Sequence, residues 1–492
     1  MTDRLVSHDP RTGEPVGSVS RTPAADVVQV VERSRRAFAS WSGLTFDERR
    51  SHLLGFKRTV LARGEEIAEV VSMETGKPVE DAYPLDVLTA LTVLDHYARN
   101  AHKYLKPRRT GTWPYPSTKA WTWYQPRGVA GVISPWNYPF FLSMIPTATA
   151  LAAGCSVVLK PSDRTPLTGQ LLGEIAASSG LPADLVQVVQ GEADVGQALV
   201  ESVDVMAFIG STAVGRKVAE SAARRLIPAI LELGGKDPII VLEDADIRQA
   251  ARATVWSGML NAGQTCTAVE RAYVVDEVYD RFMNEVAGAM TGVEAATGSR
   301  RDIGPLIDVT QYELVRDQVD DAVAKGAKVI HGGAPVEGAG GYYFQPTVLA
   351  DVDHSMAIMR DETFGPVVSV MRVPDEESAV AMANDTPYGL HATVWSKNKG
   401  RATRVASRLH SGTVAINDAS VNFIMPTLPF GGTGDSGLGV AFGAEGIRSY
   451  CVTKGVTSSR FPIPTTAFLG ARYPRRRGLR YWKTLAKALF RW

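Results

Sequence analysis

The sequence predicts two α/β domains in tandem, each built on a parallel β-sheet, together with a small β arm. Short β-branched apolar runs alternate with longer helical patterns, which is typical of βαβ units. That rhythm restarts near Gly234-Gly235, and 492 residues are enough for two or three domains. Aromatic and polar residues alternate around prolines over Trp113–Gln125, which has the pattern of a protruding hairpin.

The individual elements follow from these patterns in chain order. In the first half, helices are expected over Leu167–Ser178 and Val214–Leu226. The strands expected beside them are Val129–Ile133, Ser156–Lys160, Leu185–Val189, Val205–Ile209 and Ala229–Leu231. In the second half, one helix is expected over Ile247–Leu260 and a longer one from about Val278. The strands expected there are Pro238–Leu242, Ala272–Val275, Val329–His331, Val367–Val370, Ala392–Trp395 and Thr413–Ile416.

The composition, 45% hydrophobic and 21% charged, is that of a soluble globular protein. The net charge of +1 is unevenly placed, because residues 472–492 hold eight basic side chains and no acid. The rest of the chain is mildly acidic, so a nucleic-acid partner is not expected. Three cysteines and no signal-like N-terminus favour a reducing, cytoplasmic location. No Cys or His spacing predicts a metal site.

A lone cysteine is usually a small buried hydrophobe, but the setting of Cys266 suggests a reactive thiol. It closes the segment Asn261-Ala-Gly-Gln-Thr-Cys266, a Gly-containing loop that follows a predicted helix. Backbone N–H groups in such a loop can lower the pKa of a thiol and present the sulfur to a substrate. Cys266 is therefore a candidate nucleophile.

Three other polar residues follow predicted strands, where open α/β sheets bind their ligands. Glu232 could activate water, and Asn137 could donate to an oxyanion. The alternatives are a solvated strand-end acid and an ordinary asparagine turn. Gly210 and Ser211 precede a predicted helix whose N-terminus could hold a phosphate. Neither a Walker lysine nor the G-x-G-x-x-G fingerprint is present.

Taken together, these segments resemble the aldehyde dehydrogenase superfamily from about residue 8 to about residue 455. The matching pieces, in the family's order, are SPWNYP, KPSDRTP, FIGSTAVG, LELGGK, NAGQTC, ETFGPV and PFGG. Glu232 and Cys266 are 34 residues apart, as they are in the family. The resemblance implies an enzyme that oxidises an aldehyde to a carboxylic acid with NAD or NADP.

The resemblance also assigns roles to residues. Cys266 would attack the aldehyde to give a thiohemiacetal and then a thioester. Asn137 and the backbone N–H of Cys266 would hold the oxyanion, and Glu232 would activate the hydrolytic water. The implied cofactor contacts are Trp136, Lys160, Asp163, Gly210, Ser211, Gly234, Glu362 and Phe364. Asp163 stands where the family often has Glu, which would bind a ribose hydroxyl and repel a 2′-phosphate. NAD is therefore favoured, with NADP as the alternative.

The resemblance divides the chain into functional regions. The expected regions are a Rossmann-like cofactor-binding domain (1–111 and 128–233, with 428–450 returning to it), a catalytic domain (234–427), an oligomerisation arm (112–127 and 451–470) and a basic amphipathic tail (471–492). The arm would join subunits into a homodimer or a homotetramer.

The substrate is expected to be an apolar aliphatic or aromatic aldehyde. The segments GVISPWNYP and PFGGTGDSGLG most resemble the succinate-semialdehyde dehydrogenase branch, which binds the distal carboxylate with arginines. This chain has Ile145 and Leu260 at those positions by rough alignment. The expected tunnel residues are Phe141, Met144, Ile145, Leu260 and Phe423.

Succinate-semialdehyde dehydrogenase stays an alternative. A CoA-acylating dehydrogenase is a second alternative, although such enzymes generally lack a general-base glutamate like Glu232. A silent scaffold protein would be expected to have lost Cys266.

The last residues form an amphipathic pattern. Leu479, Trp482, Leu485, Leu489 and Trp492 fall on one apolar stripe at helical spacing. Lys483, Lys487 and Arg491 lie largely off that stripe. A short basic helix with tryptophan is a membrane-surface pattern, so 472–492 are expected to contact a membrane. The alternatives are docking on a partner subunit and a disordered tail.

Overall fold

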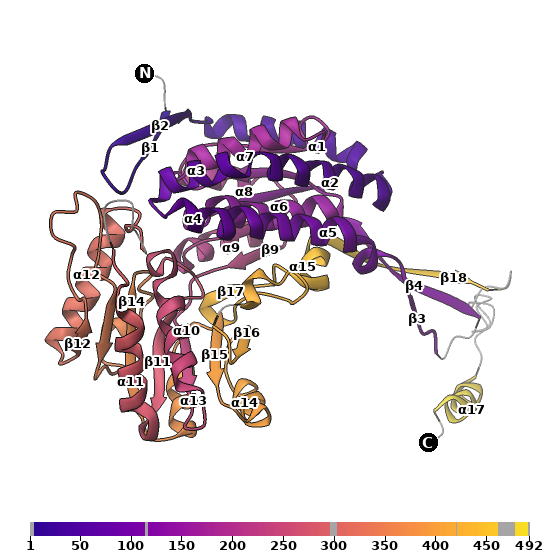
Figure 1. The fold of residues 1–492 in the computed structure, drawn as a ribbon. Coiled ribbons are helices and arrows are strands. Elements are labelled where there is room, and N and C mark those ends of the chain that lie inside the picture. The colour runs from indigo at the N-terminus through magenta and orange to yellow at the C-terminus, as the bar shows by residue number, and fades with distance from the viewer. Residues whose placement is uncertain (1–3, 114–116, 296–302, 420, 461–477, 491–492) are drawn as a thin grey trace.

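The computed structural model describes residues 4–113, 117–295, 303–419, 421–460 and 478–490. Two α/β bodies lie one above the other in Figure 1, and a thin arm projects to one side. The upper body holds most of the N-terminal half of the chain, and the lower body holds most of the second half. In the described part of the chain, no helix has both the length and the apolar character needed to cross a membrane.

The upper body is built on a six-stranded sheet of order β17-β9-β8-β5-β6-β7. Its strands are β5 (Val129–Ile133), β6 (Ser156–Lys160), β7 (Val186–Val188), β8 (Val205–Ile209), β9 (Ala229–Glu232) and β17 (Gly437–Leu438). Only β17 is antiparallel to its neighbour. In β8, Val205 and Ala207 join one apolar core while Met206 and Phe208 join another. Alternate side chains of a strand point to opposite faces, so helices must cover both faces.

Helices cover both faces of this sheet. One core contains α2 (Phe46–Ala62), α5 (Thr89–Leu105), α6 (Pro139–Ala153), α7 (Pro166–Ser178) and α15 (Gly443–Ser449). The other contains α1 (Val27–Trp41), α8 (Ala193–Val200) and α9 (Thr212–Arg224). Helix α6 is buried on all sides, begins with Pro139 and ends at Gly154, whose φ of 100° suits glycine. Before α5 come α3 (Gly64–Thr75), α4 (Val79–Ala82) and the short helix η2 (Tyr83–Leu88).

The lower body is built on a seven-stranded sheet of order β12-β13-β14-β11-β10-β15-β16. Its strands are β10 (Asp237–Val241), β11 (Val269–Val275), β12 (Lys328–His331), β13 (Thr347–Ala350), β14 (Val367–Val373), β15 (His391–Trp395) and β16 (Thr413–Ile416). Only the β12–β13 pair is antiparallel. The accompanying helices are α10 (Ile247–Met259), α11 (Asp276–Met290), α12 (Val309–Ala324), α13 (Glu376–Asn384) and α14 (Lys399–Ala406). The chain passes between the two sheets at Gly234-Gly235, which join β9 to β10.

The arm is a three-stranded antiparallel sheet of order β18-β4-β3. Strand β4 (Thr118–Pro126) pairs along its length with β18 (Cys451–Ser459) and, on its other side, with β3 (Arg108–Thr110). A separate hairpin of β1 (Arg4–His8) and β2 (Pro15–Ser20) lies at the edge of the upper body. The final described helix, α17 (Leu479–Leu489), stands beside the arm (Figure 1).

The predicted fold class is confirmed, with a few differences in detail. The strands predicted at Val129–Ile133, Ser156–Lys160, Val205–Ile209 and Thr413–Ile416 have those bounds. Strands β13 and β17 were not predicted, and β17, with two residues, is too short to show a period. Strand β12 runs antiparallel to β13, and β17 runs antiparallel to β9, so each otherwise parallel sheet has one antiparallel pair. The domain boundaries themselves stay a prediction.

Candidate active site

A cleft of about 290 Å³ receives side chains from both bodies. The upper body contributes residues that follow β5, β8 and β9, at the carboxyl ends of parallel strands. The lower body contributes the loop after α10 and the loop before β14. The cleft brings together ten of the predicted site residues: Trp136, Asn137, Ile145, Gly210, Ser211, Glu232, Gly234, Cys266, Glu362 and Phe364.

Cys266 lies in a tightly wound loop after α10. The helix ends at Met259, and Asn261 and Ala262 take left-handed φ angles of 54° and 57°. Gly263 follows with φ of 71°, and a Cβ placed on it would come within 1.9 Å of the Gly365 carbonyl oxygen. Only glycine fits this close backbone approach. The turn presents Cys266, partly buried, to the cleft.

The surroundings of Cys266 favour the neutral thiol. Burial raises the pKa of the thiol well above its usual range, and the carboxyl groups of Asp237, Glu362 and Glu232 raise it further. The protein without a bound cofactor therefore holds the protonated thiol near neutral pH.

Glu232 ends β9 with 6% of its surface exposed. Neither carboxyl oxygen has a hydrogen-bond partner among the described residues. Burial raises the pKa of this carboxyl well above its usual range. A buried acid without partners, at the wall of a cleft, is a candidate functional group.

Asn137 is held through both its amide and its backbone. Its Nδ2 donates to the Gln264 carbonyl over 3.0 Å, in the loop that carries Cys266. Its own carbonyl oxygen accepts from Asn261 Nδ2 at 3.0 Å and from Lys77 Nζ at 2.6 Å. These bonds join the start of α6 to the Cys266 loop.

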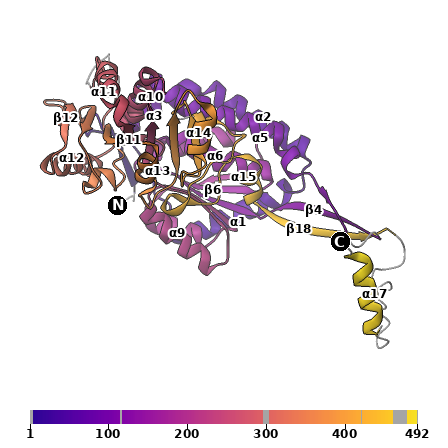
Figure 2. The same ribbon diagram turned by 90° about the horizontal axis from the view of Figure 1, so that it is seen from below.

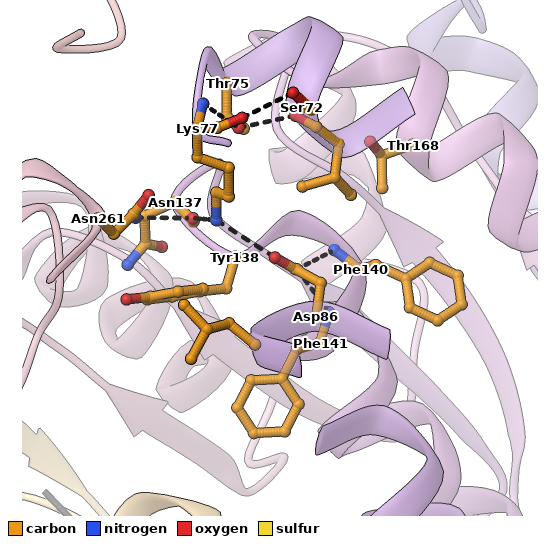
Figure 3. A network of polar contacts seen from close by, with 12 residues as sticks. Ser72, Thr75, Lys77, Asp86, Asn137, Tyr138, Phe140, Phe141, Thr168 and Asn261 are labelled. Carbon is orange, nitrogen blue, oxygen red and sulfur yellow. Dashed lines mark hydrogen bonds and ion pairs between the residues drawn. The ribbon is translucent and has the colours of Figure 1, made fainter. Parts of the chain in front are cut away.

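Lys77 is the buried centre of this network (Figure 3). Its Nζ lies 3.2 Å from Asp86 Oδ2 and 4.2 Å from the centre of the Tyr138 ring. Asp86 Oδ1 accepts from the N–H groups of Phe140 and Phe141, at 3.1 and 3.2 Å, in the first turn of α6. The sequence predicted neither Lys77 nor Asp86. Asp86 stands in the short helix η2, but Lys77 lies in the loop between α3 and α4, where no local pattern marks it.

A second buried ion pair supports the loop that carries Glu362 and Phe364. Lys236 Nζ contacts Glu270 and donates to Thr363 Oγ1 over 2.9 Å. Glu270 in turn accepts from the backbone N–H groups of Thr363 and Phe364, each at 2.9 Å. These bonds hold Phe364 at a φ of 50°, a left-handed angle unusual for a bulky residue.

Glu362 packs tightly against the two glycines that join the sheets. Its Oε1 accepts from the Gly235 N–H over 3.0 Å. A Cβ on Gly234 would lie 2.3 Å from Glu362 Oε2, so a larger residue would displace the carboxyl group. Burial and the nearby Glu270 raise the pKa of Glu362 to about 8.

The other side of the cleft has features that suit a dinucleotide. Helix α9 begins beside Ser211, whose side chain makes no capping hydrogen bond with the described residues. The first N–H groups of this helix are thus available to an anion such as a pyrophosphate. Trp136 and Phe364 meet edge to face, with ring centres 5.5 Å apart. Within the described residues, no cluster of His, Cys, Asp or Glu is arranged to hold a metal ion.

Two predicted cofactor contacts lie outside the described lining of the cleft. Lys160 is buried and donates to the Pro161 carbonyl over 3.0 Å. Asp163 is exposed and lines a neighbouring pocket with Arg164. Arg164 itself reaches both sites: it forms a 2.6 Å ion pair with Asp308 and lies 5.6 Å from the Trp136 ring centre.

Of the predicted tunnel residues, only Ile145 is among the described residues that line the cleft. Phe141 and Met144 are buried, and the Phe141 ring meets Phe423 edge to face at 6.1 Å. Phe423 also lines a separate groove of about 730 Å³, and Leu260 is partly buried at the end of α10. The apolar lining that the sequence did not single out is Leu142, Ile209, Leu233, Leu314, Leu390, Phe430 and Ala441.

Comparison with known proteins places this fold and cleft in one family. The aldehyde dehydrogenase family profile matches residues 2–456. A 4,4′-diapolycopene aldehyde oxidase of Methylomonas sp is 38% identical over 463 residues, covering 93% of this chain and 87% of the relative. A geranial dehydrogenase of Castellaniella defragrans is 38% identical over 451 residues, covering 89% and 92%. A putative NADP succinate-semialdehyde dehydrogenase of Mycobacterium tuberculosis is 37% identical over 475 residues, covering 94% and 91%.

Solved structures of aldehyde dehydrogenases have the same fold. A betaine aldehyde dehydrogenase of Staphylococcus aureus, in complex with NAD⁺, superposes with a TM-score of 0.88 at 32% identity, covering 94% of this chain and 93% of that one. The chain belongs to the aldehyde dehydrogenase family and is an NAD(P)-dependent aldehyde dehydrogenase.

The Lys77 network generates a prediction that separates folding from catalysis. Lys77→Met leaves Asp86 buried without its counter-charge, which should destabilise the protein by about 3–5 kcal/mol. The double variant Lys77→Met/Asp86→Asn should recover much of that stability, because both charges are gone. Its kcat should still fall by about tenfold, because the Asn137 carbonyl has lost its strongest donor. Urea unfolding and steady-state kinetics measure the two effects.

Lys57→Met is the matched control, since Lys57 pairs with Asp95 at 2.6 Å on the partly exposed side of α2. It should change stability by about 1 kcal/mol or less and leave kcat unchanged. A stable double variant with kcat within twofold of wild type would show that Lys77 does not position Asn137.

The raised thiol pKa predicts slow alkylation of Cys266 in the cofactor-free protein. Because the thiolate is the reactive form, the rate with iodoacetamide should be low at pH 7 and should still be rising above pH 9. Peptide mass spectrometry quantifies the adduct, with the buried Cys155 and Cys451 as internal controls. A rate that is already constant by pH 7.5 contradicts this assignment.

Proposed function

We propose that this enzyme oxidises apolar aldehydes to carboxylic acids, with Cys266 as nucleophile, Asn137 as oxyanion donor and Glu232 as the base for deacylation. The observation that carries the proposal is that one cleft holds all three side chains. Cys266 and Glu232 come from different bodies, so the fold itself brings them together.

The residues suit a two-step covalent route. The Cys266 sulfur adds to the aldehyde carbon and releases its proton to the solvent in the cleft, while Asn137 Nδ2 and the Cys266 N–H donate to the new alkoxide. Bound NAD(P) would supply the hydride acceptor that oxidation of this adduct to a thioester on Cys266 requires. Glu232 then takes a proton from water as the water attacks the thioester. The C–S bond breaks and the acid departs. Burial raises the pKa of Glu232, which strengthens the carboxylate as a base once it is ionised.

NAD is the proposed cofactor, with NADP as the alternative. The exposed Asp163 carboxylate would accept a hydrogen bond from a ribose hydroxyl and repel a 2′-phosphate. The adjacent Arg164 is already paired with Asp308, so it is not free to bind that phosphate. Glu362 and Phe364 are proposed to hold the nicotinamide end, and Ser211 with the α9 N-terminus the pyrophosphate.

An apolar substrate is proposed because the cleft offers no free cation for a distal carboxylate. Among the described lining residues, Arg164 is the only basic one, and Asp308 neutralises it. A buried carboxylate without a partner would be costly. Two relatives are named for hydrocarbon aldehydes, geranial and 4,4′-diapolycopene aldehyde. The alternative is succinate semialdehyde, after the mycobacterial relative.

We also propose that the arm joins subunits into a homodimer or homotetramer. Strand β18 lies at an edge of the arm sheet and is mostly exposed. An exposed edge strand readily pairs with another chain. The tail, residues 472–492, is proposed to contact a membrane surface.

The role of Glu232 predicts a pre-steady-state burst. Glu232→Gln should form one NADH per active site rapidly and then turn over at least about 100-fold more slowly than wild type, because the thioester accumulates. Cys266→Ala should show neither burst nor turnover. Stopped-flow absorbance at 340 nm follows both variants. Wild-type turnover by Glu232→Gln would remove Glu232 from the mechanism.

The apolar cleft predicts selectivity between two aldehydes of equal length. Hexanal should exceed 6-oxohexanoate in kcat/KM by at least about 100-fold, because the two differ only by a terminal carboxylate. Succinate semialdehyde should be as poor as 6-oxohexanoate. Ile145→Arg should reduce the difference in kcat/KM between hexanal and 6-oxohexanoate. A carboxylated substrate that matches or exceeds hexanal would favour the succinate-semialdehyde alternative.

A further inference from the structure

Helix α17 lies outside the part of the chain that the family profile matches, which ends at residue 456. Figures 1 and 2 show it beside the arm and away from both bodies. None of its residues, Leu479–Leu489, is buried. Leu479 is 69% exposed and Trp482 is 38% exposed. An amphipathic helix with its apolar side uncovered needs a partner surface.

The side chains of α17 separate into two faces. Leu479, Trp482, Leu485, Ala486 and Leu489 share one face at helical spacing. The basic residues Arg480, Lys483 and Lys487 share the other. The helix contains no acidic residue, and neither does the rest of the segment 472–492. The partner surface must therefore offer an apolar region to the leucine and tryptophan face and negative charge to the lysine and arginine face.

The length of α17 decides its orientation at such a surface. Eleven residues make a helix about 16 Å long, roughly half of the ~30 Å hydrocarbon core of a bilayer. The helix cannot span that core. It can lie in the interface, with leucine and tryptophan among the acyl chains and lysine and arginine among the headgroups.

We propose that α17 anchors the enzyme to the surface of bilayers that contain anionic lipids. The anchored enzyme then takes its apolar aldehydes from the same bilayer. The anchoring stands on the helix alone, whereas the collection of substrate rests on the proposed apolar specificity. Nucleic acid would satisfy the basic face but leave the apolar face in water. A second copy of this helix could cover the apolar face but would leave the basic face without a counter-charge.

Vesicle co-sedimentation of the full-length enzyme tests the anchoring. Wild type should bind phosphatidylcholine vesicles containing phosphatidylglycerol at least about tenfold more strongly than pure phosphatidylcholine vesicles, and 0.5 M salt should weaken the binding. Arg480→Glu/Lys483→Glu/Lys487→Glu and, separately, Trp482→Ser/Leu485→Ser/Leu489→Ser should each lose at least about tenfold of it. The control Arg36→Glu/Arg50→Glu/Arg248→Glu makes the same change of net charge at exposed residues of the two bodies and should bind as wild type does.

Activity separates the anchoring from the proposed function. With hexanal in solution, all four proteins should have equal kcat/KM. With hexadecanal embedded in anionic vesicles, both helix variants should be at least about tenfold slower than wild type and the control. Vesicle binding without any aldehyde oxidation would sink the proposed function and leave the anchor intact.

Several results would overturn the anchor itself. These are failure of wild type to sediment with anionic vesicles, equal loss of binding in the control variant, and binding abolished by nuclease. A fourth is that a helix variant has a different oligomeric mass, measured by light scattering, while wild type does not bind vesicles. That last result would assign α17 to an interface between copies of the chain.

Discussion

The active-site geometry depends on one buried ammonium group, that of Lys77. An ammonium that cannot reach water must be neutralised where it lies. Here Asp86, the Asn137 carbonyl and the Tyr138 ring do so (Figure 3). Asp86 in turn caps the first turn of α6. The contacts that neutralise Lys77 therefore fix the backbone from which the Asn137 amide projects. The hydrogen bond from that amide to the Gln264 carbonyl in turn fixes the loop that carries Cys266.

The lower body also contains a buried lysine that is neutralised by a carboxylate, formed by different residues. Lys236 is buried against Glu270, whose carboxylate binds two backbone N–H groups in the loop of Phe364. Buried ion pairs are weak evidence for stability, because desolvation offsets their attraction. Their contribution here is geometric, since each one holds a loop in a conformation that it would not adopt alone. The left-handed φ of Phe364 is the clearest case.

The sequence predicted the order of the strands along the chain and the motifs that meet in the cleft. It could not predict which side chains of α6 face the substrate, because a helix that is apolar on every side has no periodicity to read. Ile145 lines the cleft, while its neighbour Met144 packs in the core. Lys77 and Asp86 were missed for a different reason. Nothing in a local pattern tells which distant backbone carbonyl a buried charge will meet.

The contact between Gly263 and Gly365 ties two parts of the chemistry together. With no room for even one carbon atom between their backbones, the nucleophile loop and the loop of Phe364 are in rigid contact. Neither can shift without displacing the other. One backbone contact therefore sets the position of the Cys266 loop relative to the Phe364 ring.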